Sequence, residues 1–379
     1  MAEKKEKISG RRMRIRYRGR GAQVWICLGK MLRMFVYQND WKVLPMSALI
    51  AGLVGMVVRR RLFISMEGTL MGAFALVCVC IWNGCFNSVQ VICRERDVVK
   101  REHRSGMHIS SYIVAHMLYQ GLLCLGQTAV TLYVTRLTGV QYPLEGLFSG
   151  LFLVDLGVSM FLITFASDML SLWVSTIAHT TTTAMTIMPF VLIFQLVFSG
   201  GMLDLPPWAE PFTHFTISNP GLKVIAAQAD VNNRPFVTIS EMVRKMGNSD
   251  LTLNITGGQV LDILADTENP LISDLRAQEA GSGITVGEIL DSVASQEEIQ
   301  AYRDETWSYS TTVGTLVDLV GEEEVKTFLE EKAAEASYKA EYERTEKNIR
   351  GYWLHLSGFA FLFALLAMIT LEFIDKDKR

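Results

Sequence analysis

The chain has 379 residues, of which half are hydrophobic and one fifth are charged, and its formal net charge is −3. The mean hydropathy of +0.24 is high for an ordinary soluble protein, and one fifth of charged residues is too much for a chain that lies wholly within a membrane. The small net charge hides a partition, because segment 204–350 carries 26 acidic and 12 basic residues while the rest of the chain is basic. All six cysteines lie outside that acidic segment, so it would fold without disulfides. The sequence therefore predicts an acidic, polar domain inserted into a basic, apolar membrane protein.

The N-terminal region is first basic and then amphipathic. Residues 1–22 form a basic tail, and no apolar core follows it closely enough for a cleaved signal peptide. Beside a membrane protein, such a tail more often meets anionic lipid than nucleic acid. Within 23–42, apolar residues recur at helical spacing opposite Lys30 and Arg33, with aromatic residues at either end. This pattern predicts an amphipathic helix that lies along the membrane interface.

Six apolar stretches are candidates for membrane-spanning helices. The first is about 24 Å long at 1.5 Å per residue, so it needs flanking residues to cross about 30 Å of hydrocarbon. The fifth contains Pro189, which favours a kink. Together they predict an all-α polytopic membrane protein. The six stretches are 43–58, 69–93, 111–135, 147–177, 183–203 and 352–373.

Basic residues in the short loops predict the orientation of these spans. One side holds 20 basic residues, in 1–42, 94–110 and 375–379, and the other side holds 4. The first side is therefore expected to be cytoplasmic, with both termini, and segment 204–350 to be extracellular. Helices one to five occupy 43–203 and the sixth occupies 351–374. Three consecutive arginines at 59–61 depart from the rule, and the sequence offers no account of them.

A dense run of charge at 94–110 separates the second span from the third. Helix-forming residues fill it up to Ser105, and Gly106 is suited to the C-cap. One interpretation is a solvated cytoplasmic loop. The other is a docking helix that a cytoplasmic partner grips in order to move the two spans. The residues expected to make that contact are Arg94, Glu95, Arg96, Lys100, Arg101 and Glu102.

A short pattern recurs within the acidic segment, at 256–262 (TGGQVLD), 285–291 (TVGEILD) and 312–318 (TVGTLVD), with a degenerate copy at 237–243. Each copy predicts a threonine N-cap followed by a helix, and Thr285 with Glu288 predicts a capping box. The copies are either a true repeat or three helices that begin alike. Residues 322–347 favour a helical stalk that leads into the last span. A mainly helical extracellular domain is therefore expected.

Catalytic motifs are missing from the sequence. There is no GxxxxGK[ST] motif, and the six histidines are scattered over separate elements, so we expect no catalytic, metal or cofactor site on this chain. Asp155 and Asp168 fall inside the fourth span, where an acid is costly and often functional. For Asp155 a position near the outer interface is the simpler interpretation. Asp168 would lie deeper, towards the cytoplasmic side, and either a functional or buried-pair role or no special role is open for it.

The layout resembles the permease half of type-2 ABC exporters, especially the White/ABCG branch. The most specific similarity is 198–208 (FSGGMLDLPPW), continuing to Ser218-Asn-Pro, which is similar to that family's turn and re-entrant segment after span five. Arg94-Glu-Arg matches the start of the family's coupling helix. The acidic segment departs from the pattern, because it is longer and lacks the extracellular cysteines of animal members. The family's nucleotide-binding domain is also missing from this sequence.

The resemblance implies a path through the membrane lined by spans two and five. Asn83 and Asn87 share a helical face on span two, and Phe190, Phe194 and Phe198 share one on span five. With Asp168 they are the candidate path residues, which would suit an amphipathic substrate. The alternative is that the asparagines bond neighbouring helices and the phenylalanines pack in the bundle or face lipid.

The sequence is therefore interpreted as the permease subunit of an ATP-driven exporter in a plasma membrane, with absent disulfides favouring a bacterial one. The expected partners are a separate ATPase subunit, which holds the ATP and magnesium, a second permease copy or homologue, and membrane lipid. No nucleic acid is expected. The alternatives are a membrane-anchored receptor or adhesion protein, and a protein that transmits force across the membrane.

Overall fold

In the computed structural model the chain divides into two compact units. The helical unit comprises Met1–Phe236 and Ala336–Arg379, and the inserted unit comprises Val237–Glu335. The structure describes residues 19–37, 40–200, 206–235 and 338–373 of the first unit, and 250–265, 270–279, 283–288, 291, 305–312, 327–328 and 332 of the second.

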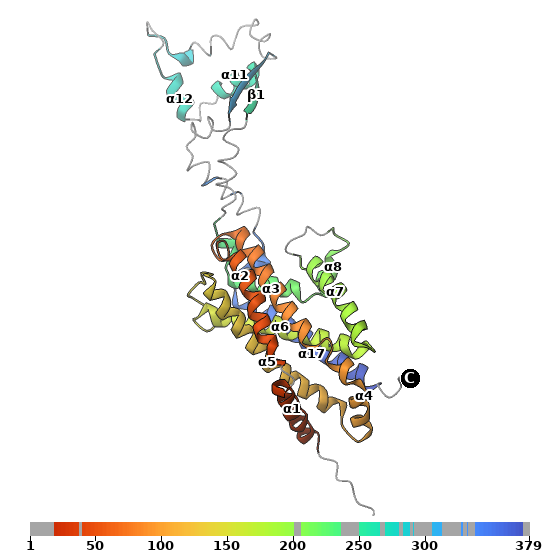
Figure 1. Cartoon of the computed structure of the whole chain (residues 1–379). Coiled ribbons are helices and arrows are strands. Elements are labelled where there is room, and N and C mark those ends of the chain that lie inside the picture. Colours follow the sequence, from red (N-terminus) through yellow and green to blue (C-terminus); the bar gives the residue numbers. More distant parts are fainter. Residues whose placement is uncertain are drawn as a thin grey trace, which may run out of the picture. The chain divides into compact units, whose positions relative to one another are not determined.

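Apolar helices build the helical unit (Figure 1). Within the described ranges, four helical stretches are long and apolar enough to cross a membrane: Met66–Arg104, Ile109–Leu137, Phe152–Ile177 and Glu346–Glu372. Two shorter apolar helices have 16 and 17 residues. The described helices are α1 (Arg20–Tyr37), α2 (Val43–Val58), α3 (Met66–Ser88), α4 (Val91–Arg104), α5 (Ile109–Leu137), α6 (Phe152–Ile177), α7 (Thr181–Val197), α8 (Glu210–Thr213), α9 (Ser218–Gln228) and α17 (Glu346–Glu372). The first of the four long stretches contains two helices, α3 and α4.

Helix α6 lies at the centre of this unit and packs most extensively against α3 and α17. The approach of α3 to α6 is close because Gly84 has no side chain: a Cβ there would overlap the carbonyl oxygen of Thr164 and lie 2.9 Å from the Asp168 nitrogen. Around this centre α5 packs against α2 and α1, and α9 packs against α3, α6 and α17. The short helix α9 is buried along almost its whole length.

Helix ends follow their local sequence. Hydroxyl side chains of Ser65, Thr180 and Thr345 accept hydrogen bonds from backbone N–H groups three residues on, and so begin α3, α7 and α17. Helix α4 ends at Arg104 with Ser105 as its C-cap, so Gly106, the predicted C-cap, lies one residue further on, where its φ is 102°. The Gly106 and Met107 N–H groups donate to the carbonyls of His103 and Glu102, which is the Schellman arrangement.

The inserted unit contains two strands that the sequence analysis did not predict. Strands β1 (Asp250–Thr256) and β2 (Thr306–Thr312) are antiparallel, with Leu253 opposite Tyr309. Helices α11 (Gly257–Ala265) and α12 (Pro270–Arg276) follow β1. The expectation of a mainly helical domain was therefore wrong for these two segments. In each of them apolar and polar residues alternate in the sequence, which is the pattern of a strand.

Two of the three recurring threonine motifs begin helical turns. The Thr285 and Glu288 side chains exchange hydrogen bonds with each other's backbone N–H, which confirms the predicted capping box. Thr256 and Gln259 do the same at α11. The third threonine, Thr312, is instead the last residue of β2. Residues 313–318 and the degenerate copy at 237–243 lie outside the described residues.

The compact inserted unit is shorter than the predicted segment 204–350. Helices α8 and α9 precede it within the helical unit, and residues 338–345 follow it there. The predicted stalk helix over 322–347 is interrupted, because Lys339 and Glu343 are extended around a 3₁₀ turn at Ala340–Tyr342. Helix α17 then begins at its own cap, Thr345.

Candidate coupling helix and membrane path

Helix α4 has one face against the protein and one face outward. Ile92 and Val99 are fully buried, which anchors the helix to the bundle. The exposed charged residues recur at intervals of three and four, which places them on one side. They are Arg94, Asp97, Arg101 and Arg104.

Lys30 joins α1 to the inner flank of α4. Its ammonium lies 3.3 Å from the Glu102 carboxylate and 3.9 Å from the Glu95 carboxylate. The turn after α4 is also held, because the Gln23 amide donates to the Gly106 carbonyl and accepts from the His108 N–H. Partly exposed ion pairs contribute only about 0–1 kcal/mol each. These contacts therefore hold α4 in place against α1 but add little to the stability of the fold.

Arg96 joins α4 to the end of α6. Its guanidinium donates to the carbonyl oxygens of Thr176 at 2.9 Å and Ala178 at 3.2 Å. A cation is favoured at a helix C-terminus, where the carbonyls lack intrahelical partners. The Ser175 hydroxyl adds to this joint by accepting from the N–H groups of Ile92 and Cys93.

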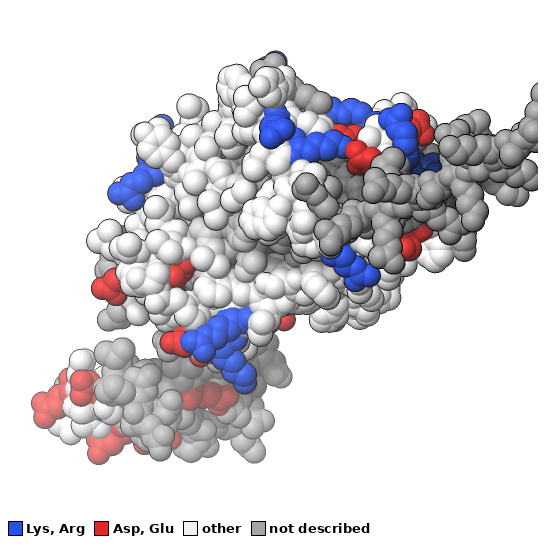
Figure 2. Space-filling model, turned by 90° about the horizontal axis from the view of Figure 1, so that it is seen from below, with Lys and Arg blue, Asp and Glu red and all other residues white. Residues whose placement is uncertain are grey.

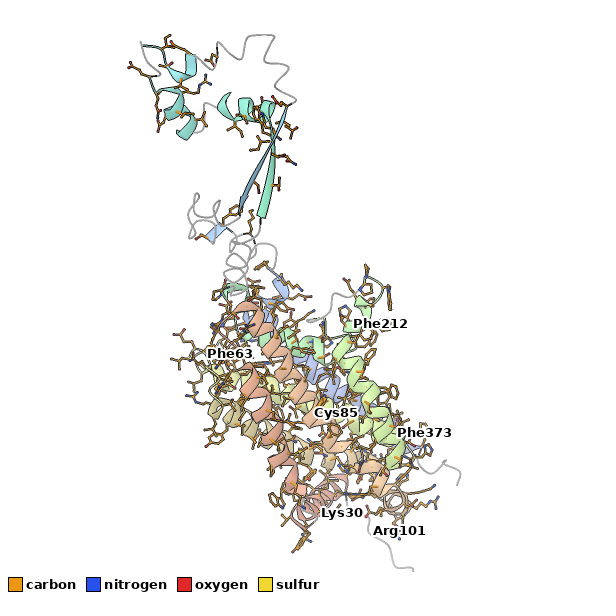
Figure 3. All side chains as sticks on the ribbon, turned by 45° about the horizontal axis from the view of Figure 1, so that its top comes forward. Lys30, Phe63, Cys85, Arg101, Phe212 and Phe373 are labelled. Carbon is orange, nitrogen blue, oxygen red and sulfur yellow. The ribbon has the colours of Figure 1, made fainter. Side chains whose placement is uncertain are left out.

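The six predicted contact residues of α4 therefore divide. Glu95, Arg96 and Glu102 contact α1 and α6 of their own chain. Arg94 and Arg101 have exposed side chains, and Lys100 is half-buried. Asp97 and Arg104, which the sequence analysis did not select, complete the exposed face. Helical spacing could have separated the two groups. Figure 3 shows Lys30 and Arg101 near the same end of the helical unit, far from Phe63 and Phe212.

The two candidate path asparagines bond to other helices. The Asn83 amide donates to the Ser47 hydroxyl of α2 at 2.8 Å. Asn87 and Gln127 of α5 exchange two hydrogen bonds, of 2.8 and 3.0 Å. These contacts favour the interhelical alternative for both residues, and their place in a path stays a prediction.

The two acids of α6 lie in different surroundings. Asp155 accepts from the N–H groups of Leu147, Phe148 and Ser149 and from the Ser149 hydroxyl, so it organises the preceding loop. Asp168 is fully buried, and one oxygen lies 3.8 Å from the Cys124 thiol. Its other oxygen has no hydrogen-bond partner among the described residues. Within those residues no group of three His, Cys, Asp or Glu could hold a metal ion.

Of the three candidate phenylalanines, one is exposed on the surface and two are in contact with other aromatic rings. Phe190 is 72 % exposed. The Phe194 and Phe198 rings lie 4.7 Å apart, and Phe198 lies 5.4 Å from Phe212, which links α7 to α8. Between them Gln195 is buried, and its side-chain oxygen accepts from the Ile217 and Ser218 N–H groups. That amide supplies α9 with the N-terminal cap that its own residues do not provide.

Helices α3 and α7 each expose an apolar face; the sequence analysis selected Phe190 on α7 but not the exposed residues of α3. On α3 this face carries Met71, Trp82 and Phe86, with the two rings 6.4 Å apart. On α7 it carries Phe190 and Ile193. Spacing of four residues was the available signal, but periodicity does not separate a lipid-facing surface from an interface.

Charged side chains lie mainly at the edges of the face that carries α1 and α4. Figure 2 shows basic and acidic side chains next to one another at the top of this view, further charged side chains along its rim, and a mostly uncharged surface between them. The architecture is that of an all-α, polytopic membrane protein with a charged helix directly after one span.

The family model for the ABC-2 type transporter matches residues 10–220, which is more than half of the chain. The chain belongs to this family, and is therefore a membrane-embedded transport permease rather than a catalytic enzyme. Permeases of this family generally pair with an ABC ATPase subunit. No curated protein matches the chain.

Proposed function

We propose that this permease is the membrane subunit of an ATP-driven exporter of the White/ABCG-like type. Two copies, or one copy and a homologue, form the translocation path in a plasma membrane, and a separate ATPase binds ATP and magnesium. The short helices α2 and α7 complete six spans with α3, α5, α6 and α17. Both termini are then cytoplasmic and the inserted unit is extracellular.

The observation that carries this proposal is the division of charge on α4. One flank contacts α1 through Lys30, and Arg96 donates to the C-terminal carbonyls of α6, so we assign the exposed outer face to the partner. That face presents Arg94, Asp97 and Arg101. Because α4 follows α3 after only two residues, a force on it passes to α3, α1 and α6 together.

Transmission of this kind explains how ATP binding could move the spans. A partner that binds one arrangement of α4 better than another shifts the equilibrium by its difference in affinity. The rigid contacts at Arg96 and Ser175 then convert a displacement of α4 into one of α6. Alternation between inward and outward states follows from rigid-body movement of packed helices.

The exposed apolar faces of α3 and α7 are the surfaces that we assign to the path and to the second copy. Trp82, Phe86 and Phe190 are large apolar side chains on those faces. Aromatic residues supply much of the contact at protein interfaces. Of the predicted path residues, Phe190 keeps its place on this surface, whereas Asn83 and Asn87 lie behind it, bonded to α2 and α5.

Cysteine crosslinking tests this assignment. In a chain whose half-buried Cys27 and Cys78 are replaced by serine, Trp82→Cys or Phe190→Cys should form a disulfide-linked species of two permease chains on mild oxidation. ATP with vanadate should change its yield severalfold, because the path closes. The matched control is Leu125→Cys, which is 59 % exposed on α5. Crosslinking at Leu125 equal to that at both test positions would contradict the assignment.

A further inference from the structure

A cavity of about 270 Å³ lies within the helical unit, beside the joint between α3 and α4. Residues of α1, α5 and α7 also line it. Its apolar wall includes Met31 of α1, Leu123 of α5 and Met185 of α7. The cavity is therefore bounded by the elements that meet around the proposed coupling helix, but it lies within one chain.

Two buried polar side chains of α5 line this cavity, and each has polar atoms with no hydrogen-bond partner among the described residues. His116 is 3 % exposed, and neither ring nitrogen has a partner among the described residues. Gln120, one turn further along α5, is 1 % exposed; its amide nitrogen donates to the Ser88 hydroxyl, and its oxygen has no hydrogen-bond partner in the described part of the chain. Leaving a buried polar group unpaired costs about 1–3 kcal/mol, so a bound partner would recover that energy.

The His116 ring nitrogens and the Gln120 oxygen indicate which chemical groups a ligand in the cavity would need. A neutral imidazole offers one donor and one acceptor, and the Gln120 oxygen offers a second acceptor. Hydroxyl groups, which both donate and accept, match this set. Arg94 and Glu95 both border the cavity, so its lining has no excess of either charge to select an ionic ligand.

The position of the site favours a ligand with an apolar tail. His116 lies seven residues into α5, which is about 10 Å along the helix axis, close to the end that joins α4. Phe86 lines the cavity and also lies on the exposed apolar face of α3, where it is 50 % exposed. A chain attached to the head group could therefore leave past Phe86 into hydrocarbon.

We propose that this cavity binds the head group of a neutral, hydroxyl-bearing amphiphile, with His116 and Gln120 holding the hydroxyls. The assignment concerns the single chain and does not depend on coupling to an ATPase. If the cavity does not bind such a ligand, the proposed exporter function still stands. If the chain does not couple to an ATPase, ligand binding in the cavity still stands.

The test is equilibrium binding of radiolabelled 1-monooleoylglycerol to the full chain in phosphatidylcholine nanodiscs, with empty nanodiscs as the blank. Saturable binding should approach one ligand per chain. His116→Leu should weaken it about tenfold, which corresponds to about 1.4 kcal/mol. Met34→Trp, a change on α1 that fills the cavity and leaves His116 and Gln120 unchanged, should abolish it. Thr128→Val should leave it within about twofold, because Thr128 is also a buried, unsatisfied residue of α5 but does not line the cavity.

Competition by unlabelled molecules shows which part of the ligand the cavity recognises. Unlabelled monooleoylglycerol should displace the probe, whereas methyl oleate, which has no hydroxyl, and glycerol, which has no tail, should not compete at the same concentration. Equal competition by methyl oleate would remove the hydroxyl requirement, and equal competition by glycerol would make this a site for soluble polyols. Stronger competition by lysophosphatidic acid would make it a phosphate site. Each of these results, or wild-type affinity in both His116→Leu and Met34→Trp, overturns the proposal.

Discussion

Gly84→Ala is expected to destabilise the helical unit severely. A methyl group at Gly84 would overlap the Thr164 carbonyl oxygen, and the Asp168 nitrogen and the Ser167 Cβ lie 2.9 and 3.0 Å away. Two of these three atoms belong to backbone, so no rotamer change relieves the overlap and α3 must move away from α6. Overpacking of this kind costs about 1–3 kcal/mol and occasionally more. Because α6 is the helix on which α3, α9 and α17 converge, the displacement should reach the whole unit.

The measurement is the thermal unfolding of the purified chain, followed by the loss of its monodisperse chromatographic peak after heating. Gly84→Ala should lower the midpoint by about 5–10 °C, and Gly84→Val should yield little folded protein. Gly121→Ala is the control, because the nearest atom to its Cβ is Phe165 Cε2 at 3.8 Å, an ordinary contact. A midpoint for Gly84→Ala equal to that of Gly121→Ala would show that the close approach is absent.

The double variant Asp97→Arg with Arg101→Glu is expected to separate the permease from its ATPase without unfolding it. Both side chains are exposed on the outer face of α4, and the exchange leaves the net charge unchanged. Reversal of docked charges typically costs several kcal/mol at a complementary interface, so the recovered ATPase should fall at least about tenfold. Co-purified chains that carry a GxxxxGK[ST] motif would be quantified by mass spectrometry, together with their ATP hydrolysis.

The control is Arg136→Glu, an exposed arginine in the last turn of α5, at the end remote from α4. A second comparison uses Glu95→Lys with Arg96→Glu. This pair should lower the thermal stability of the chain, because it breaks the contacts to Lys30 and to the end of α6. Undiminished recovery of the ATPase with Asp97→Arg and Arg101→Glu would place the docking surface elsewhere.

Much of the helical unit could be predicted because apolar runs and caps are local signals. The stretch 43–58 coincides with α2, and Gly106 directly follows the C-cap of α4, where a positive φ suits glycine. The charged helix itself also followed from composition. Its internal partners did not, because the carbonyls that Arg96 binds lie 80 residues further along the chain and carry no residue-specific signal.

Other features depended on tertiary contacts that periodicity does not encode. Asn87 shares a face with Asn83, but only the packing of α3 on α5 places Gln127 opposite it. In the inserted unit the sequence did carry a local signal, but that signal was not used. Leu251, Leu253 and Ile255 alternate with polar residues over β1, which is a strand pattern, but the sequence analysis used only the helix starts that follow it and predicted a mainly helical domain.

Site-specific photocrosslinking from α4 tests most directly whether this permease works through an ATPase. A benzoylphenylalanine side chain at position 101 of the tagged chain, activated by light in intact cells, should give one adduct that contains a GxxxxGK[ST] chain. The same group at Arg136 should not. The yield at position 101 should change when ATP is depleted, because the partner's grip on α4 depends on its nucleotide state. No such adduct from 101, or an equal one from 136, would contradict coupling through the outer face of α4.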